Sequence, residues 1–228
     1  MGSLLLVRHG QASFGAANYD QLSALGQRQC RRLGEYLAQR GRRFEAVYGG
    51  TLARHRQSWQ AIAEGMGPAA PTGPWHSLAA LNEYDSAAMM ALVQAEPLAQ
   101  TSNAAPSEQY RHHFRVLREG LTRWMDGSAT PAGMPSHADF KAGIAAVLDR
   151  IRSDYSGDVL LVSSGGPIAN AVAQVLNAPA VTAIDLNMRM RNSSVTEFVF
   201  TPKRHQLMTF NTLPHLDDPA WEHAVTSM

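Results

Sequence analysis

Residues 4–10 read LLLVRHG, and this stretch decides the fold. Four apolar residues in a row are typical of a strand that is covered on both faces in a parallel sheet. The run stops at Arg8 and His9, which therefore follow the carboxyl end of that strand. Open α/β sheets bind their ligands at this end of the strands. The stretch thus predicts a buried strand with a functional site beside it.

The rest of the chain alternates between helix and strand patterns. Ser23 is expected to cap a helix that runs to about Arg40, and Gly41 to end it. The other expected elements are strands over 44–48, 159–162, 195–200 and 206–210 and helices over 52–64 and 167–177. Strands that alternate with helices indicate an α/β fold. No repeat or linker divides the sequence, so we expect one domain over residues 1–228.

Residues 86–152 carry helical patterns and no alternating strand. One apolar stripe at helical spacing comprises Tyr110, Phe114, Leu117, Leu121 and Trp124. Segment 127–135 is rich in Gly and Pro and predicts a loop. The Met and aromatic side chains of this region can line a pocket for an organic group, but such residues more often belong to the core.

The composition excludes several partners and locations. There are 20 Lys and Arg against 19 Asp and Glu, a net charge of +1, so no global field attracts nucleic acid or a membrane surface. No metal-binding motif is present, and we expect neither a metal nor a cofactor. The single Cys30 cannot form an intramolecular disulfide and is expected to be buried in a helix, and the opening apolar run is too short for a signal peptide. A cytoplasmic protein is the expectation.

The residues after the first strand have the chemistry of phosphoryl transfer. A neutral imidazole such as His9 can attack phosphorus and carry the phosphoryl group covalently. Arg8 is adjacent, and Arg54 opens the helix after the second strand, so both guanidinium groups can bind one phosphate. Glu83 can protonate the leaving oxygen as a general acid.

Ordered motifs along the chain strengthen this interpretation. They are LVRHGQ at 6–11, LSALG at 22–26, TLAR at 51–54, LNE at 81–83, VSSGG at 162–166 and NSSV at 192–195. With these motifs the sequence resembles the histidine phosphatase superfamily, also called phosphoglycerate mutase-like. The resemblance implies a three-layer α/β/α sandwich with a mostly parallel sheet and a helical cap inserted at about 86–135. It also implies that His9 is the phosphorylated nucleophile, that Arg8 and Arg54 hold the phosphate, and that Glu83 is the proton donor.

The sequence departs from the family pattern at two positions. Ser164 stands where the family usually has a second histidine, and the missing charge is expected to cost about 1 to 3 kcal/mol of transition-state stabilisation. On this basis Ser164→His should raise turnover. Gly15 stands where the family often has an asparagine that binds phosphate. Ser13, or the backbone amides of Gly10 and Gln11, are the candidate replacements.

Further side chains complete the expected site. Gln11, Ser13, Ser164 and Gly165 are the remaining candidate phosphate contacts. His137 begins a helix and is a candidate to supply the charge that Ser164 lacks, although a histidine at a helix start is more often structural.

Several functions remain open from sequence alone. Tyr84 and Asp85 follow Glu83 where a mutase pattern would continue with arginine, so hydrolysis of a phosphomonoester by an acid phosphatase-type enzyme is favoured over a bisphosphoglycerate-type mutase. The alternatives are that mutase, or a phosphate-binding relative weakened by Ser164. A serine hydrolase with Ser164, Asp185 and His205 or His215 is the rival from another class, but Val162 stands where the Gly-x-Ser-x-Gly pattern has its first glycine. The expected partner is a small phosphomonoester or a phosphoprotein. The oligomeric state is open, with a homodimer as one option.

Overall fold

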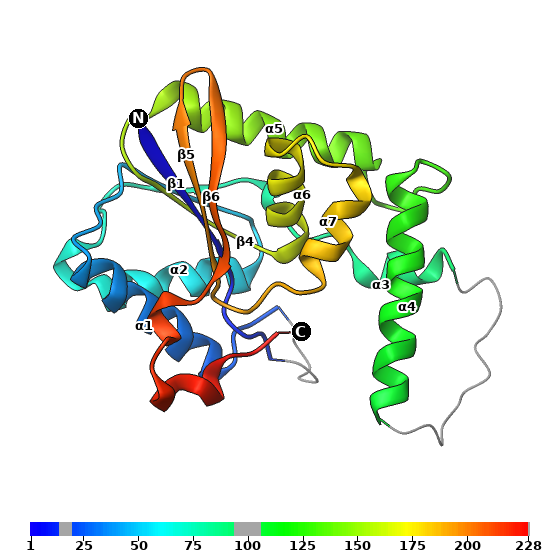
Figure 1. Cartoon of the computed structure of the whole chain (residues 1–228), viewed down its shortest axis with the longest axis horizontal. Coiled ribbons are helices and arrows are strands. Elements are labelled where there is room, and N and C mark those ends of the chain that lie inside the picture. Colours follow the sequence, from blue (N-terminus) through cyan, green and yellow to red (C-terminus); the bar gives the residue numbers. More distant parts are fainter. Residues whose placement is uncertain (14–19, 94–105, 228) are drawn as a thin grey trace.

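A six-stranded sheet is the centre of the chain in this computed structural model (Figure 1). The structure describes residues 1–13, 20–93 and 106–227, without the side chains of 106, 107, 109 and 110. The strands are β1 Gly2–Arg8, β2 Ala46–Gly49, β3 Trp75–Ser77, β4 Val159–Ser163, β5 Val195–Thr201 and β6 Arg204–Thr212. They lie in the order β3-β2-β4-β1-β5-β6. Strands β3, β2, β4 and β1 are parallel, while β5 is antiparallel to both β1 and β6, so the predicted mostly parallel sheet is confirmed.

Helices cover both faces of this sheet. They are α1 Ala24–Gln39, α2 Ala53–Met66, α3 Ser86–Ala91, α4 Pro106–Met125, α5 His137–Asp154, α6 Gly165–Val175 and α7 Ala180–Asn187. Short 3₁₀ helices are η1 Gly67–Ala69, η2 Ala79–Leu81, η3 Pro214–Leu216 and η4 Pro219–Ala224. In Figure 1, α1 and α2 lie together on one side of the strands, and α5, α6 and α7 lie on the other.

The apolar run of β1 explains this arrangement. Successive side chains of a strand point to opposite faces. Leu4 and Leu6 belong to the hydrophobic cluster that α4, α5, α6 and α7 cover, whereas Leu5 and Val7 belong to the cluster under α1 and α2. All four side chains are at most 2% exposed. The uninterrupted apolar run therefore has partners on both faces, and the predicted three-layer α/β/α fold is confirmed.

Helix α1 begins and ends as its sequence predicts. The Ser23 Oγ accepts a hydrogen bond from the backbone N–H of Gly26 at 3.0 Å, which satisfies one of the free amides of the first turn. Gly41 follows the helix with a φ of 68°, a conformation that glycine adopts without strain. Cys30 is buried within α1, as expected.

The segment expected as a helical insertion, 86–135, contains α3 and α4. A Cβ on Gly120 of α4 would lie 2.2 Å from the Met89 carbonyl oxygen, so the two helices are in direct contact. Met89 and Trp124 are at most 1% exposed and belong to the core rather than to a pocket wall. The side chain of Tyr110 lies outside the described residues.

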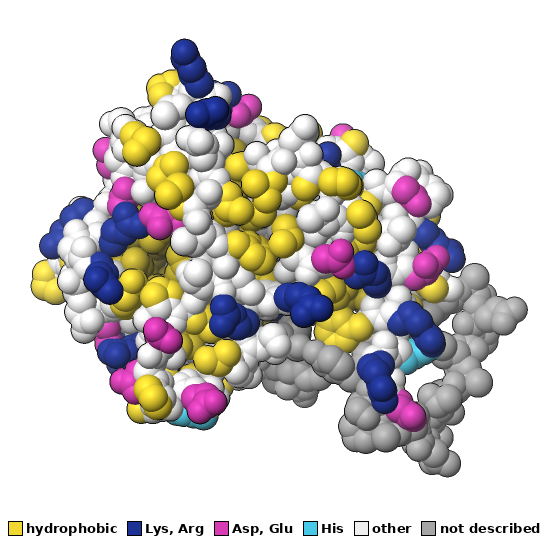
Figure 2. All heavy atoms as spheres, viewed as in Figure 1, with side chains coloured by type: hydrophobic (Ala, Val, Ile, Leu, Met, Phe, Trp, Pro, Cys, Tyr) yellow, Lys and Arg dark blue, Asp and Glu magenta, His cyan; other side chains and the backbone are white. Residues whose placement is uncertain are grey.

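The visible surface carries charges of both signs. Figure 2 shows Lys and Arg side chains interspersed with Asp and Glu on this face, with apolar side chains between them over β6, α6 and α7. Interspersed charges produce no extended positive field of the kind that attracts nucleic acid. None of the helices in the described ranges combines the length and the apolar character needed to cross a bilayer.

Candidate active site

His9 lies directly after β1 and is oriented by its own backbone. Its Nδ1 lies 2.7 Å from the carbonyl oxygen of Gly10. A carbonyl oxygen only accepts, so Nδ1 carries the proton and Nε2 keeps its lone pair. Burial lowers the pKa of His9 well below its ordinary value of 6.5, and the charges of Arg8 and Arg54 lower it further. With 4% of its surface exposed, His9 is a neutral imidazole with a narrow opening to solvent.

Arg8 and Arg54 reach this imidazole from different elements. Arg8 is the last residue of β1 and is 3% exposed, and its guanidinium donates to the carbonyl oxygen of Met190. Arg54 lies in the first turn of α2 and is 7% exposed. Both positive charges act on His9 and on Glu83. The structure therefore brings together the two guanidinium groups that the sequence predicted to share one site.

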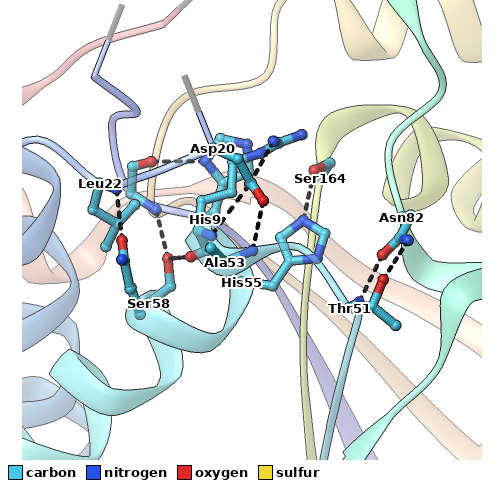
Figure 3. A network of polar contacts seen from close by, with 12 residues as sticks. His9, Asp20, Leu22, Thr51, Ala53, His55, Ser58, Asn82 and Ser164 are labelled. Carbon is cyan, nitrogen blue, oxygen red and sulfur yellow. Dashed lines mark hydrogen bonds and ion pairs between the residues drawn. The ribbon is translucent and has the colours of Figure 1, made fainter. Parts of the chain in front are cut away.

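Asp20 holds Arg54 in place, and sequence reasoning missed it. Its carboxylate accepts from the Arg54 Nη1 at 2.9 Å and from the backbone N–H of Ala53 at 2.8 Å (Figure 3). An anion at a helix N-terminus is favourable because the unpaired amides and the helix dipole attract it. Arg54 is buried, whereas Arg56, two residues further along α2, is exposed.

Glu83 approaches from the loop after η2. Its two carboxylate oxygens lie 3.1 and 3.2 Å from the backbone N–H of Gly166, near the start of α6. A Cβ on Gly166 would lie 2.2 Å from Oε1, so only glycine permits this approach. Burial raises the pKa of the Glu83 carboxyl, although the Gly166 hydrogen bond and the charge of Arg54 oppose this shift. A carboxyl with a raised pKa holds its proton to higher pH and suits a general acid.

Ser164 follows β4 and contacts a histidine that the sequence analysis did not assign. The His55 Nε2 lies 2.7 Å from the Ser164 Oγ, and both residues are fully buried (Figure 3). The His55 ring centroid lies 5.8 Å from that of His9. One signal was present: His55, Ser58 and Ile62 follow the i, i+3, i+7 spacing of a buried helix stripe.

The other candidate phosphate contacts have partners already. The backbone amides of Gly10 and Gln11 donate to Ser58 at 3.1 Å and to Gln29 at 2.8 Å, so the expectation that they replace the asparagine contact requires breaking both bonds. The Gln11 side chain accepts from the Ser23 hydroxyl at 2.9 Å.

Ser13, Gly165 and Gly15 are the remaining positions that the sequence analysis discussed for phosphate binding. The backbone N–H of Ser13 donates to Gln21. Gly165 is buried and begins α6, where a Cβ would meet the Asn187 Oδ1 at 2.0 Å. Gly15 lies outside the described residues.

His137 has contacts of its own. Its Nε2 lies 3.0 Å from the Asn170 Oδ1, and its ring packs edge-on against Trp124 with centroids 5.0 Å apart. Asn170 in turn donates to the Gly166 carbonyl oxygen at 2.9 Å. The ring is thus held in the layer of α4, α5 and α6, while the imidazole beside Ser164 comes from His55.

The residues of the serine hydrolase alternative are dispersed. Asp185 pairs with Arg118 on the surface, and His205 packs against Phe198. His215 contacts the Ser193 hydroxyl at 2.9 Å. The structure therefore does not assemble the rival combination of Ser164 with Asp185 and His205 or His215, since the imidazole that contacts Ser164 is His55.

The comparisons with known proteins identify the family. Residues 4–213 match the model of the histidine phosphatase superfamily (branch 1), and the chain belongs to this family. That membership supports an enzyme of the phosphatase or mutase type. No curated protein matches the chain by sequence.

Solved structures share the fold at low identity. A phosphoserine phosphatase from Entamoeba histolytica, in complex with 3-phosphoglyceric acid, has a TM-score of 0.63 and 19% identity over 95% of this chain and 100% of that one. A mycobacterial glucosyl-3-phosphoglycerate phosphatase in complex with VO3 has a TM-score of 0.63 and 24% identity over 92% and 99% of the two chains. At these identities the likeness establishes the fold.

Proposed function

We propose that this protein is a phosphomonoester hydrolase that acts through a covalent phosphohistidine on His9. The observation that carries the proposal is a neutral imidazole, with its Nε2 lone pair available, under the positive charge of two buried guanidinium groups. Neutrality makes the ring a nucleophile, and the fixed charges favour a phosphate beside it.

The proposed reaction has two displacements. In the first, the His9 Nε2 bonds to phosphorus, the ester P–O bond breaks, and Glu83 gives its proton to the leaving oxygen. In the second, water attacks the phosphohistidine while the Glu83 carboxylate takes its proton, and inorganic phosphate leaves as the P–N bond breaks. Glu83 thus acts as acid and then as base, which its position beside Gly166 permits in both steps.

The phosphate contacts follow from the same arrangement. Arg8 and Arg54 neutralise the equatorial oxygens, and their planar guanidinium groups suit paired hydrogen bonds to phosphate. Ser164 adds one hydroxyl, and Gly165 places the N-terminus of α6 close to the anion. Gln11 and Ser13 stay proposed contacts at the mouth of the site.

Hydrolysis is favoured over mutase chemistry by the residues after Glu83. A mutase must bind a second anionic end of its substrate and needs further cations there. The Tyr84 hydroxyl instead accepts a hydrogen bond from Asn187 at 2.7 Å, and the Asp85 carboxylate caps α3 by accepting from Ala87 at 2.9 Å. Tyr84 is thus used in packing and Asp85 carries a negative charge, so neither supplies a cation for a second anionic group. A mutase would convert 3-phosphoglycerate when 2,3-bisphosphoglycerate is supplied, and we expect no such conversion.

The substrate class is a small phosphomonoester, with a phosphoprotein as the second option. We propose that the segment 86–135 acts as a cap and selects the leaving group. The related phosphatases named above act on phosphoserine and on glucosyl-3-phosphoglycerate, by their names, and these are the first compounds to assay. A cytoplasmic location suits such substrates.

Turnover of a generic aryl phosphate tests the function. Wild-type protein is expected to release p-nitrophenol from p-nitrophenyl phosphate, and His9→Ala to lose on the order of 10⁴-fold or more, as when a covalent nucleophile is removed. Thermal unfolding of both proteins controls for folding. An inactive wild type would favour the phosphate-binding relative, and a His9→Ala variant with full activity would exclude His9 as nucleophile.

A further inference from the structure

The Ser164 hydroxyl does not cap helix α6, although Ser164 stands at the N-cap position. Ser164 is the residue that precedes α6, where a serine normally caps the helix by accepting from a backbone amide. Its side chain makes no such bond, and its Oγ instead lies 2.7 Å from the His55 Nε2. A helix cap has therefore been given up for contact with a second element, α2.

The surroundings of His55 determine its tautomer. Burial, together with the charge of Arg54, lowers the pKa of His55 to about 3, so the ring is neutral and carries a single proton. Its Nδ1 is buried with no hydrogen-bond partner among the described residues, and a Cβ on Gly50 would lie 2.3 Å from it. Because orphaned N–H groups in protein interiors are rare, the proton belongs on Nε2, where Ser164 can accept it.

This tautomer directs the hydroxyl of Ser164. The Oγ accepts from His55, so its own hydrogen points elsewhere. Strands β1 and β4 are parallel, with Arg8 opposite Ser163, and the backbone N–H of His9 donates to the Ser163 carbonyl oxygen at 2.9 Å. Ser164 is consequently the neighbour of His9 at the carboxyl ends of the two strands. A phosphoryl group on His9 would place an oxygen within reach of this hydroxyl.

We propose that His55 is a positioning residue that donates to Ser164, so that the Ser164 hydroxyl donates to an oxygen of the phosphoryl group in transit to and from His9. This role rests on the proposed function of His9 as nucleophile. Two elements share the role of one hydrogen-bond donor. Ser164 contacts the phosphoryl oxygen, and His55 fixes the direction of the Ser164 hydroxyl hydrogen.

The packing of His55 has a consequence for position 164. The imidazole fills the space beside the Ser164 Oγ, so a second imidazole at that position would collide with it. The sequence alone favoured a gain of turnover in Ser164→His. With His55 in contact, we expect the single change to lose activity, and the exchange His55→Ala with Ser164→His to recover it.

A coupling measurement tests the pair. The variants are Ser164→Ala, His55→Ala, their double and His55→Gln, with kcat for p-nitrophenyl phosphate as the readout and thermal unfolding as the check of folding. Ser164→Ala and His55→Ala should each lower kcat about ten- to hundredfold, the worth of a hydrogen bond to a charged group. The double variant should be no worse than Ser164→Ala by more than about threefold, because contacting residues are coupled. His55→Gln retains a donor at similar reach and should recover most of the loss.

Each alternative outcome has a definite meaning. Losses that multiply in the double variant, or an unchanged kcat in His55→Ala, overturn the proposal. A Ser164→His variant as active as wild type overturns the packing on which it rests. The exposed Arg56 is the matched control, and Arg56→Ala should retain wild-type kcat. If His9→Ala is inactive while the coupling is absent, only this inference fails; if His9→Ala is active, the proposed function fails.

A serine-directed probe separates this role from a serine nucleophile. The distance of 2.7 Å would also suit a histidine that removes the proton of Ser164. With its pKa lowered to about 3 by burial and by the charge of Arg54, His55 is a weak base, which disfavours removal of the Ser164 proton. We expect no labelling of Ser164 by a fluorophosphonate. Stoichiometric labelling at Ser164 would overturn the proposal.

Discussion

Strands β1 and β4 lie side by side and run parallel, yet their carboxyl ends obtain their chemistry differently. The end of β1 provides its own guanidinium and imidazole, Arg8 and His9, in consecutive positions. The end of β4 provides only the hydroxyl of Ser164, and the imidazole beside it comes from α2. The comparison shows that the imidazole at the carboxyl end of a strand can come from the strand's own chain, as at β1, or from a neighbouring helix, as at β4.

The difference also explains how the two ends respond to change. At the end of β1, a Cβ on Gly10 would lie 2.4 Å from the Gly26 carbonyl oxygen, which is backbone and cannot move aside. At the end of β4, a Cβ on Gly166 would lie 2.2 Å from a carboxylate oxygen of Glu83 and 2.7 Å from the buried ring of Tyr84. A side chain would therefore displace backbone at the first end and would displace the Glu83 carboxyl group and the Tyr84 ring at the second.

After His9→Ala, replacement of Glu83 is expected to have the largest effect. Glu83→Gln keeps the size of the side chain but removes the acid, so kcat for an alkyl phosphate should fall about 10²- to 10⁴-fold. An aryl phosphate, whose leaving group needs less protonation, should be affected much less. Parallel assays of β-glycerophosphate and p-nitrophenyl phosphate measure the difference. An equal loss on both substrates would exclude Glu83 as the proton donor.

The pH profile of kcat/KM sharpens this result. His9 must be neutral, so the rate rises with pH through the His9 pKa, which burial and two arginines hold well below 6.5. Glu83 must be protonated, so the rate falls with pH through the Glu83 pKa, which burial raises above 4.5. Glu83→Gln should remove the fall on the alkaline side and keep the rise on the acid side. A fall that persists in this variant would assign it to another group.

Arg54 and Arg56 form a matched pair for the next prediction. Arg54→Ala removes a buried charge beside His9 and should lower kcat about 10²- to 10³-fold, as for the loss of one fixed transition-state donor. Arg56 is exposed two residues further on, and Arg56→Ala should be neutral. Steady-state kinetics on one substrate decide the matter. Equal effects of the two changes would mean that Arg54 contributes only to the general charge of α2.

The sequence predicted the frame of the fold and most of the residues of the candidate site. Long apolar runs and clear caps identified β1, α1 and β4, because local patterns determine those elements. Strand β3 has three residues and α7 has eight, with no side-chain cap, so neither leaves a strong pattern. His55 was missed because its contact joins residues 109 positions apart, and periodicity within one helix does not report which strand end it meets.

Asp20 was missed for a related reason. Its role depends on the Arg54 guanidinium and the first amides of α2, which lie more than thirty positions later in the chain. A carboxylate in a loop has no distinctive spacing. Only the packed structure shows that it holds the cation that the motif identified.

A methyl group at Gly166 tests the approach of Glu83 to the end of β4, with a smaller expected effect. Gly166→Ala should displace the Glu83 carboxyl and lower kcat for an alkyl phosphate about tenfold, equivalent to about 1.4 kcal/mol. Because the new methyl group would also lie 2.7 Å from the buried Tyr84 ring, thermal unfolding is measured alongside kcat. Kinetics of Gly166→Ala in the Glu83→Gln background give the control, since the loss should vanish there. A loss of the same size in that background would point to a different cause.

The smallest effect is expected far from both strand ends. The Ser136 hydroxyl caps α5 by accepting from the Asp139 amide at 3.1 Å, and Ser136→Ala should lower the free energy of unfolding by about 1 kcal/mol. Denaturant titration measures this change, while kcat should stay at the wild-type value. A fall in kcat would mean that helix stability alone affects the rate, and the losses predicted above would then need correction.

Direct detection of the phosphohistidine tests the central claim. Wild-type protein mixed rapidly with a phosphomonoester and quenched in alkali should carry one acid-labile phosphoryl group, and mass spectrometry should place it on His9. A phosphoryl group on Ser164 or another residue, or turnover with no covalent phosphoprotein at any time point, would contradict the account.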